Sequence, residues 1–210
     1  HCLTCDDVTA EMCKLVENTY RDINIAFANQ LSEICAIAGI DVYELIALAN
    51  RHPRVNILNP GLGVGGHCLA VDPWFLVERY QEDASLINEA RKINDGKPQW
   101  VMTQMEKQLQ GGERIGILGM AYKPDIDDMR ESPSLHLAHL LEAKGYEVYG
   151  CEPNSRADEL EGIPLLGLDE CLKQCDYVVI ALGHKEFLAP AAKEAILSVP
   201  HYDCIGFEKA

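Results

Sequence analysis

Residues 177–182 read YVVIAL, a continuous run of apolar side chains. Such a run is typical of a parallel strand that is buried on both faces of a sheet. Towards the N-terminus, residues 147–151 (EVYGC) alternate like a strand and residues 114–118 (RIGIL) form another short apolar run. A helical pattern over 134–144, closed by Gly145, lies between those two segments. Strands that alternate with helices predict a doubly wound parallel sheet in this half of the chain.

The chain ahead of residue 112 shows helical patterns instead. Apolar side chains recur at helical spacing over residues 7–38, where Asp7 or Thr9 can cap the start and Gly39 can end the helix. Further helices are expected over 41–50, after Pro73 and over 83–109, where residues 94–98 could interrupt the pattern. We therefore predict an all-helical domain over residues 1–112 and an α/β domain over residues 113–210.

The composition is that of a globular protein, and it limits the possible functions. The 210 residues carry a net charge of −15, which argues against non-specific nucleic-acid binding. No apolar run approaches the ~18 residues that span a bilayer, so neither a membrane association nor a signal peptide is expected. The nine cysteines are odd in number and several lie in apolar surroundings, so we expect reduced thiols and a cytoplasmic protein.

A glycine-rich segment, NPGLGVGGHC at residues 59–68, interrupts the helical half. Its glycines let the backbone approach a ligand closely and point successive N–H groups at it. Cys68 ends the segment and Asp72 lies four residues further on, which suits a nucleophilic thiol with a nearby carboxylate. A flexible loop with a buried cysteine fits the same residues, and His67 could be a base, a metal ligand or a structural residue.

Two polar residues of the first predicted helix share one face. Lys14 and Asn18 are four residues apart, and their face is not the apolar one. A lysine can hold an anion, and an asparagine amide can donate to an oxyanion. A solvated helix face, with Lys14 paired to Glu11 or Glu17, explains the same spacing.

A zinc site is the other chemistry that the cysteines could support. Cys2-x-x-Cys5 is a single pair, and no second pair stands at zinc-finger spacing. Cys171 and Cys175 are four residues apart and distant in the sequence. We therefore expect no metal.

Three long strings occur in order: AEMCKLVENTYRDINIAFANQL at 10–31, RHPRVNILNPGLGVGGHCLAVDP at 51–73 and GILGMAYKPDIDDMRESPSL at 116–135. Together they closely resemble the UDP-sugar 6-dehydrogenase family, which includes the UDP-glucose and GDP-mannose dehydrogenases. The resemblance implies a helical central domain that forms a homodimer through its long helix, followed by a Rossmann-like domain that binds the UDP-sugar. The strings NRHPRVNIL and GVGGHC-x-x-VDPW look most like the branch that acts on UDP-N-acetyl-hexosamines, UDP-N-acetyl-mannosamine above all.

The resemblance also implies the chemistry, an NAD-dependent four-electron oxidation of the sugar C6 alcohol to a carboxylate. Cys68 matches the cysteine that adds to the intermediate aldehyde as a thiohemiacetal and then carries a thioester, which water hydrolyses. Lys14 and Asn18 match the residues that stabilise the oxyanion and position the water. Asp72 matches the carboxylate that acts with the lysine in water activation.

Binding residues are implied in the same way. The loop that wraps the UDP-sugar corresponds to a segment that includes Asn59, Gly61, Gly63 and Gly65, and the pair that holds the nucleotide corresponds to Tyr122 and Lys123. An arginine donated across the dimer corresponds to one of Arg51, His52 or Arg54, and an arginine that reaches NAD corresponds to Arg130. The structural alternative for Lys123 and Arg130 is pairing with Asp125, Asp127, Asp128 or Glu131.

Two departures from the family pattern matter. The family begins with an NAD-binding domain, and because residue 1 lies just before the central helix, we expect that domain to be absent and these residues alone to oxidise nothing. Gly116-x-x-Gly119-x-Ala121 is not the GxGxxG of an NAD site, and the chain ends IGFEKA where the family usually has an arginine. A non-catalytic, UDP-sugar-binding dimerisation module is therefore the alternative function.

Overall fold

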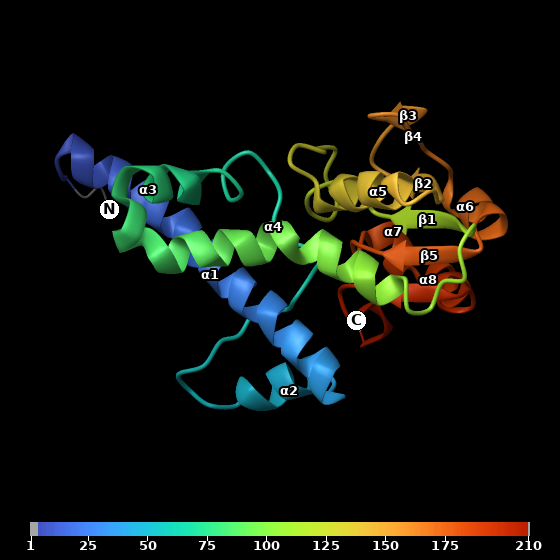
Figure 1. The fold of residues 1–210 in the computed structure, drawn as a ribbon, viewed down its shortest axis with the longest axis horizontal. Coiled ribbons are helices and arrows are strands. Elements are labelled where there is room, and N and C mark those ends of the chain that lie inside the picture. Colours follow the sequence, from blue (N-terminus) through green and yellow to red (C-terminus); the bar gives the residue numbers. More distant parts are fainter. Residues whose placement is uncertain (1–3, 210) are drawn as a thin grey trace.

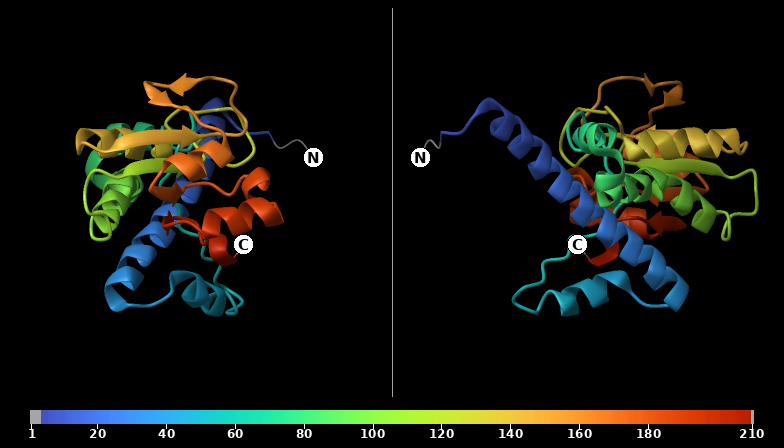
Figure 2. Two further views of the ribbon diagram at one scale, coloured as in Figure 1. Left: turned by 90° about the vertical axis from the view of Figure 1, so that its right-hand side faces the viewer. Right: turned by 60° about the vertical axis from the view of Figure 1, so that its left-hand side comes forward.

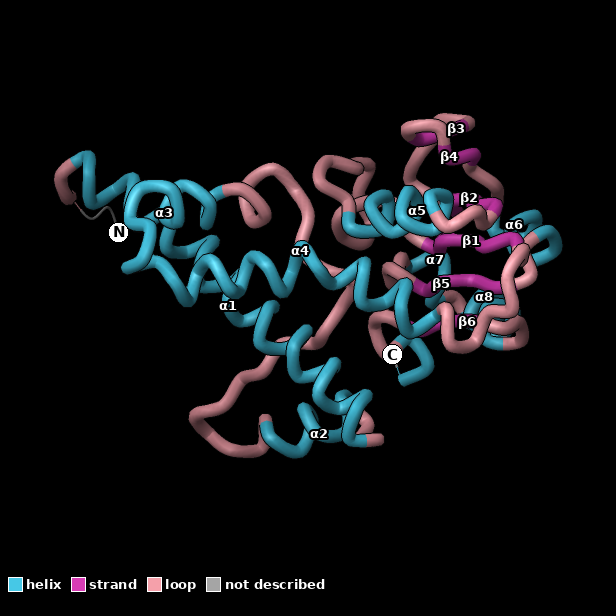
Figure 3. The backbone as a smooth tube through the Cα atoms, in the orientation of Figure 1, coloured by secondary structure: helices cyan, strands magenta, loops and turns pink. Residues whose placement is uncertain are grey.

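Helices and strands are segregated along the chain. The computed structural model describes residues 4–209. The first half is helical and the second half contains the sheet, with the long helix α4 reaching from one to the other (Figure 1). Strands gather at one end of the molecule and only helices and loops occupy the other (Figure 3). No helix of the described part is long and apolar enough to cross a membrane.

The predicted first helix is present as α1 (Asp7–Ala38). Its cap is Asp6, whose side chain accepts a hydrogen bond from the Thr9 backbone N–H over 2.9 Å, so the prediction of Asp7 or Thr9 as the cap is wrong. A cap residue precedes the helix with extended backbone angles, and Asp7 is already helical. Gly39 ends the helix as predicted, in a left-handed conformation with φ 68°.

The remaining helices of this half are α2 (Val42–Ala49), α3 (Asp72–Tyr80), the short 3₁₀ helix η1 (Gln81–Ala84) and α4 (Ser85–Met105). The expected interruption over residues 94–98 is wrong, because α4 continues through Pro98. Proline removes one helical hydrogen bond, the one to the carbonyl of Asn94, and here the packing of α4 against α1 and the sheet maintains the helix.

The second half is built on a four-stranded parallel sheet in the order β2-β1-β5-β6. Its strands are β1 (Arg114–Leu118), β2 (Glu147–Cys151), β5 (Tyr177–Ile180) and β6 (His201–Asp203). A small antiparallel pair, β3 (Glu159–Leu160) and β4 (Ile163–Pro164), forms a second sheet next to β2. The connecting helices are α5 (Pro133–Ala143), α6 (Leu168–Gln174), α7 (Lys185–Leu188), α8 (Pro190–Leu197) and the 3₁₀ helix η2 (Phe207–Lys209).

Helices cover both faces of this sheet. Ile115 and Ile117 of β1 pack with side chains of α4 and α5, whereas Leu118 packs on the opposite face with α6, α7 and α8. Both clusters consist of buried apolar side chains, as expected for a sheet that is covered on both sides. This arrangement confirms the predicted doubly wound α/β fold after an all-helical part.

The position of α4 bears on the predicted boundary near residue 112. Its first half packs against α1, and its last turns contribute Val101, Met102 and Met105 to the core beneath the sheet. The change from helix to strand falls between Met105 and Arg114. A division at residue 112 stays a prediction, because one continuous helix contributes to both cores.

Candidate functional site

Three of the four predicted catalytic residues, Lys14, Asn18 and Cys68, line one cavity of about 390 Å³. It lies between α1, the glycine-rich segment and the loop after β1, which come from three separate stretches of the sequence. Its lining includes Lys14, Asn18, Gly63, Gly65, Cys68, Tyr122 and Lys123. The fold therefore brings together the thiol, the lysine–asparagine face and the residues expected to bind the nucleotide.

Asp72 reaches this group through Asn18. The amide Nδ2 of Asn18 donates to the Asp72 carboxylate over 2.5 Å, and Asp72 is the first residue of α3. Asn18 is only 5 % exposed, so a solvated helix face does not describe it. Lys14 is exposed and forms no ion pair with Glu11, Glu17 or any other residue that the structure describes. Its ammonium group is therefore available to a ligand in the cavity.

Glycine is required at residues 65 and 66, where the glycine-rich segment passes close to Tyr122. A Cβ atom on Gly65 would lie 2.7 Å from Cβ of Tyr122, and one on Gly66 would lie 2.8 Å from the Tyr122 ring. Gly66 also has a φ of 86°, which disfavours any other residue. Its N–H donates to the carbonyl of Arg130 over 2.9 Å. The wall of the cavity is thus a direct contact between the two halves of the chain.

The cavity is locally cationic although the chain carries a net charge of −15. Lys14, Arg21 and Lys123 line it, and none of the described lining residues is acidic. Arg21 was not predicted from the sequence. It stands seven residues after Lys14 and three after Asn18, so helical spacing extended by one turn would have found it.

Other predicted binding residues lie elsewhere in this chain. Asn59 lines a different cavity, beside Ile205 and Gly206. Gly61 does not face the thiol cavity, and its N–H donates to the side chain of Asn29 over 2.9 Å. Residues 51–54 form an exposed turn after α2. This turn contains Arg51, His52 and Arg54, the three candidates for a residue that is donated to a partner copy. That turn extends away from the sheet-containing half (Figure 2).

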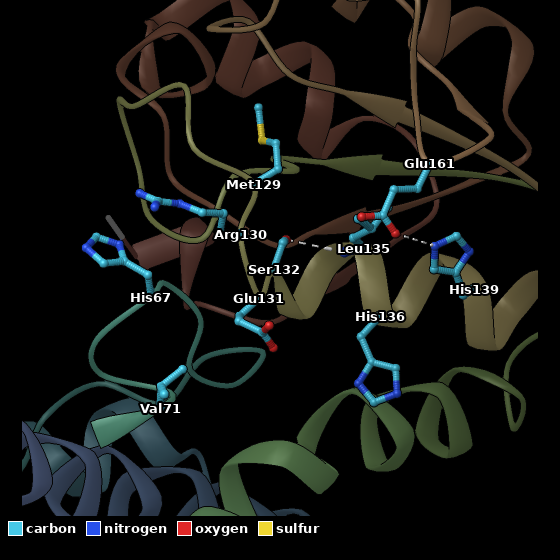
Figure 4. Close-up of a pocket in the computed structure, with 10 residues that line it drawn as sticks. All are labelled: His67, Val71, Met129, Arg130, Glu131, Ser132, Leu135, His136, His139 and Glu161. Carbon is cyan, nitrogen blue, oxygen red and sulfur yellow. Dashed lines mark hydrogen bonds and ion pairs between the residues drawn. The ribbon is translucent and has the colours of Figure 1, made fainter. Parts of the chain in front are cut away.

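Arg130 faces a second and larger cavity of about 720 Å³. His67 and Arg130 lie on one side of it, and His139 with Glu161 lies on another (Figure 4). The guanidinium of Arg130 pairs with Asp128 over 2.6 Å, and this hydrogen bonding lowers the pKa of Asp128 to about 2. The structural alternative for Arg130, pairing with a nearby carboxylate, is therefore present. Its predicted contact with NAD stays a prediction.

Metal ligation fits the described residues poorly. Asp125, His184 and Glu186 place ligand atoms within 4.8 Å of one another. However, Nδ1 of His184 already accepts the Asp125 backbone N–H over 3.0 Å, and both carboxylates are exposed. Of the CxxC pair considered for zinc, Cys5 is exposed and Cys2 lies outside the described residues.

The sheet domain also fits a dinucleotide poorly. In such folds an acidic residue at the carboxyl end of the second strand binds the ribose. Glu152 holds that position here, but it is 5 % exposed and its carboxylate accepts backbone N–H groups of Met120 and Ala121. GLGVGG at 61–66 matches the glycine spacing of a dinucleotide loop, yet it follows α2 and a loop and not a strand. Neither the sheet domain nor the glycine-rich segment therefore has the features of a dinucleotide site.

Family models match both halves of the chain. The central domain of the UDP-glucose/GDP-mannose dehydrogenase family matches residues 8–96, and the UDP binding domain of the same family matches residues 116–204. The chain belongs to the UDP-glucose/GDP-mannose dehydrogenase family, whose members are NAD-dependent.

Individual relatives agree with this assignment. UDP-N-acetyl-D-mannosamine dehydrogenase of Salmonella typhi is 49% identical over 203 residues, which is 90% of this chain and 48% of that protein. An NDP-N-acetyl-D-galactosaminuronic acid dehydrogenase of Ralstonia solanacearum is 46% identical, over 89% of this chain and 45% of that protein. The solved UDP-D-ManNAc dehydrogenase of Pyrococcus horikoshii is 38% identical with a TM-score of 0.83, over 95% of this chain and 48% of that one. The chain spans about half the length of the curated relatives that it matches.

Proposed function

We propose that this chain supplies the UDP-sugar-binding and covalent-catalysis parts of a UDP-sugar 6-dehydrogenase. The observation that carries the proposal is the cavity where Cys68, Lys14 and Asn18 meet Tyr122 and Lys123. These residues come from three distant stretches of the sequence, and a general-purpose binding module has no need for a thiol at their centre. Membership of the family gives the reaction class.

In this proposal Cys68 forms and breaks the covalent bond to the substrate. Its thiolate adds to the C6 carbonyl carbon of a sugar aldehyde, and the electron pair of the C=O bond moves to oxygen. Lys14 and the second N–H of the Asn18 amide stabilise that oxyanion. Loss of a hydride from C6 of this adduct to the electron acceptor gives a thioester. Asp72 with Lys14 then assists the attack of water on the thioester carbonyl carbon, and the thiolate leaves as the carboxylate forms. NAD is the family's electron acceptor, and the residues described here support only the substrate side of the reaction.

The nucleotide part of the substrate lies against Tyr122 and Lys123. A UDP-sugar carries a diphosphate, and the three cations of the cavity lining with backbone N–H groups of the glycine-rich segment suit such a ligand. Because the rest of the chain is strongly acidic, the attraction must be local. The proposed sugar is N-acetyl-mannosamine, since that substrate is named for the Salmonella typhi and Pyrococcus horikoshii relatives.

The proposed active form is a homodimer through α1. Large apolar side chains lie exposed along one stripe of this helix at Val16, Tyr20, Phe27 and Ile34. They are separated by four, seven and seven residues, so they share one face, and Asn18 and Asp22 are buried on another. The exposed turn at residues 51–54 would then reach the cavity of the partner copy with one arginine or histidine.

Isothermal titration of the 210-residue chain with UDP tests the binding part of this proposal. Wild-type protein is expected to bind UDP, and Lys123→Ala and Arg21→Ala are each expected to weaken binding by about tenfold, because each removes one charged contact to a phosphate. Arg79→Ala is the matched control, since Arg79 is exposed on α3 and lines none of the cavities described. Absence of binding at millimolar UDP contradicts the proposal.

A further inference from the structure

A buried carboxylate holds the first turn after β1. Glu152 follows the last residue of β2, and its oxygen Oε2 accepts the backbone N–H groups of Met120 over 2.8 Å and Ala121 over 3.0 Å. The other oxygen, Oε1, accepts the backbone N–H of Asn154 over 3.1 Å and its side-chain amide over 3.2 Å. The carboxylate thus acts as an internal acceptor for a loop that would otherwise leave buried N–H groups unpaired.

A fully buried histidine extends this contact. Nε2 of His184 lies 3.1 Å from Oε2 of Glu152, and Nδ1 accepts the backbone N–H of Asp125 over 3.0 Å. Because a backbone N–H can only donate, Nδ1 carries no proton and Nε2–H donates to the carboxylate. One imidazole in this tautomer links Glu152 to the far end of the same loop.

The two residues therefore hold the segment 120–125 at both ends. Asp125 has a φ of 62°, an unfavourable conformation for a residue other than glycine. Its strain is offset by the bond to His184 and by the Lys185 backbone N–H, which donates to its carboxylate over 3.0 Å. Tyr122 and Lys123 lie between the two held ends, and Tyr122 is the residue that contacts Gly65 and Gly66.

We infer that Glu152 and His184 are positioning residues that fix the Tyr122–Lys123 segment in the shape that binds the nucleotide part of the substrate. This inference rests on the proposed function, and neither side chain lines the cavity. A different role for Glu152, direct hydrogen bonding to a ribose, requires a carboxylate with free acceptor capacity. The acceptor capacity of Glu152 is instead taken up by donors of the protein itself, which are backbone N–H groups, the Asn154 side-chain amide and His184.

The charge state of Glu152 agrees with this geometry. Burial alone raises the pKa of a carboxyl group, but the hydrogen bonds from His184 and from backbone N–H groups outweigh it, so the pKa of Glu152 lies below its usual value. The side chain is a carboxylate at neutral pH and can accept from several donors at once. An amide at the same place has one acceptor oxygen and would direct an NH₂ group at other donors.

Hydrogen exchange and UDP titration of Glu152→Gln test the inference. The backbone N–H groups of Met120, Ala121 and Asp125 are expected to exchange at least about tenfold faster than in wild type, and UDP is expected to bind about tenfold more weakly. Glu147→Gln is the matched control, because Glu147 is an exposed acid at the opposite end of the same strand. Should Glu152→Gln fail to fold, Asn154→Ala is the milder variant, since it removes only the side-chain bonds to Glu152 and His184.

A double-mutant cycle with Lys123→Ala separates positioning from a general loss of stability. If Glu152 acts through this segment, Lys123→Ala costs clearly less affinity in the Glu152→Gln background than in wild type. The inference is overturned if the two substitutions lower the UDP affinity additively. It is also overturned if the Glu152→Gln protein folds and binds UDP within about twofold of wild type. If wild type binds no UDP, the proposed function fails. In that case the hydrogen-exchange rates of Glu152→Gln still test the positioning role. Rates at Met120, Ala121 and Asp125 that equal those of wild type refute it.

Discussion

Burial separates Cys68 from most of the other cysteines. Cys35, Cys151, Cys171, Cys175 and Cys204 are buried in the cores. Burial raises the pKa of Cys151 to about 12 and that of Cys204 in the same direction, which keeps these thiols protonated and inert. Cys68 is half-buried and lines the cavity together with Lys14 and Lys123, so a ligand can reach this thiol and not the buried ones.

This difference predicts the pattern of thiol alkylation. Iodoacetamide is expected to label Cys5, Cys13 and Cys68 in the folded chain, and to label the five buried cysteines only after denaturation. UDP-sugar is expected to protect Cys68 alone, with Cys5, which is exposed ahead of α1, as the internal control. Peptide mass spectrometry measures both. Equal labelling of Cys68 with and without saturating ligand would place its thiol outside the binding site.

The elements of the helical half are joined by buried amide side chains. Asn29 on α1 accepts the Gly61 N–H over 2.9 Å and donates to Asn94 on α4 over 2.9 Å. Pro98 has no N–H to give to the carbonyl of Asn94, and Gly63 lies against that carbonyl. The glycine-rich segment is therefore held onto both long helices, and on α4 it lies beside the carbonyl that Pro98 leaves without its helical hydrogen bond.

Two glycine substitutions in these elements are expected to have opposite effects. A Cβ on Gly63 would lie 2.8 Å from the Asn94 carbonyl oxygen, and its φ of 136° disfavours alanine, so Gly63→Ala is expected to lower the free energy of unfolding by about 2 kcal/mol or more. Gly96 lies within α4, where an added Cβ would meet no atom within 4 Å beyond the backbone of its own helix, so Gly96→Ala is expected to add about 0.5–1 kcal/mol. Urea unfolding measures both. A stabilising Gly63→Ala would contradict the close approach.

Local patterns in the sequence were enough for most of these elements. The apolar runs located β1 and β5, and Gly39 located the end of α1, because each depends on neighbouring residues only. The expected break at Pro98 was wrong because packing against distant residues decides it. The Asn29–Asn94 contact was missed for the same reason, since residues 65 positions apart leave no periodic signal. Arg21 continues the helical spacing of Lys14 and Asn18, so a local pattern did mark it. The cavity could be predicted only through the family resemblance, which supplied the pairing of distant motifs.

Helix α1 differs between its buried side and its exposed side, and this difference bears on how the whole molecule assembles. Its buried side carries polar residues, among them Asn18, Asp22 and Asn29, which serve the cavity and the contact with α4. Its exposed side carries Phe27 and Ile34, at 54% and 56% exposure. In the right-hand view of Figure 2, α1 lies in front with no other described element over most of its length. A long apolar stripe on a single chain predicts a partner, and a second copy presents the same stripe.

Light scattering of the 210-residue chain is therefore expected to give twice the chain mass of 23.3 kDa. Introducing charges on the stripe with Phe27→Asp and Ile34→Asp together should give a monomer, because pairing two copies would bury four carboxylates without partners. Leu188→Asp is the control: it adds the same charge at an exposed apolar residue of α7, far from α1 in the sequence, and should leave the dimer intact. If the doubly substituted protein remains a dimer, α1 is not the interface. If the doubly substituted protein is a monomer, UDP titration shows whether residues 51–54 of a partner copy contribute to binding. A monomer lacks the partner's turn but keeps its own cavity, so its UDP affinity should be lower than that of the dimer.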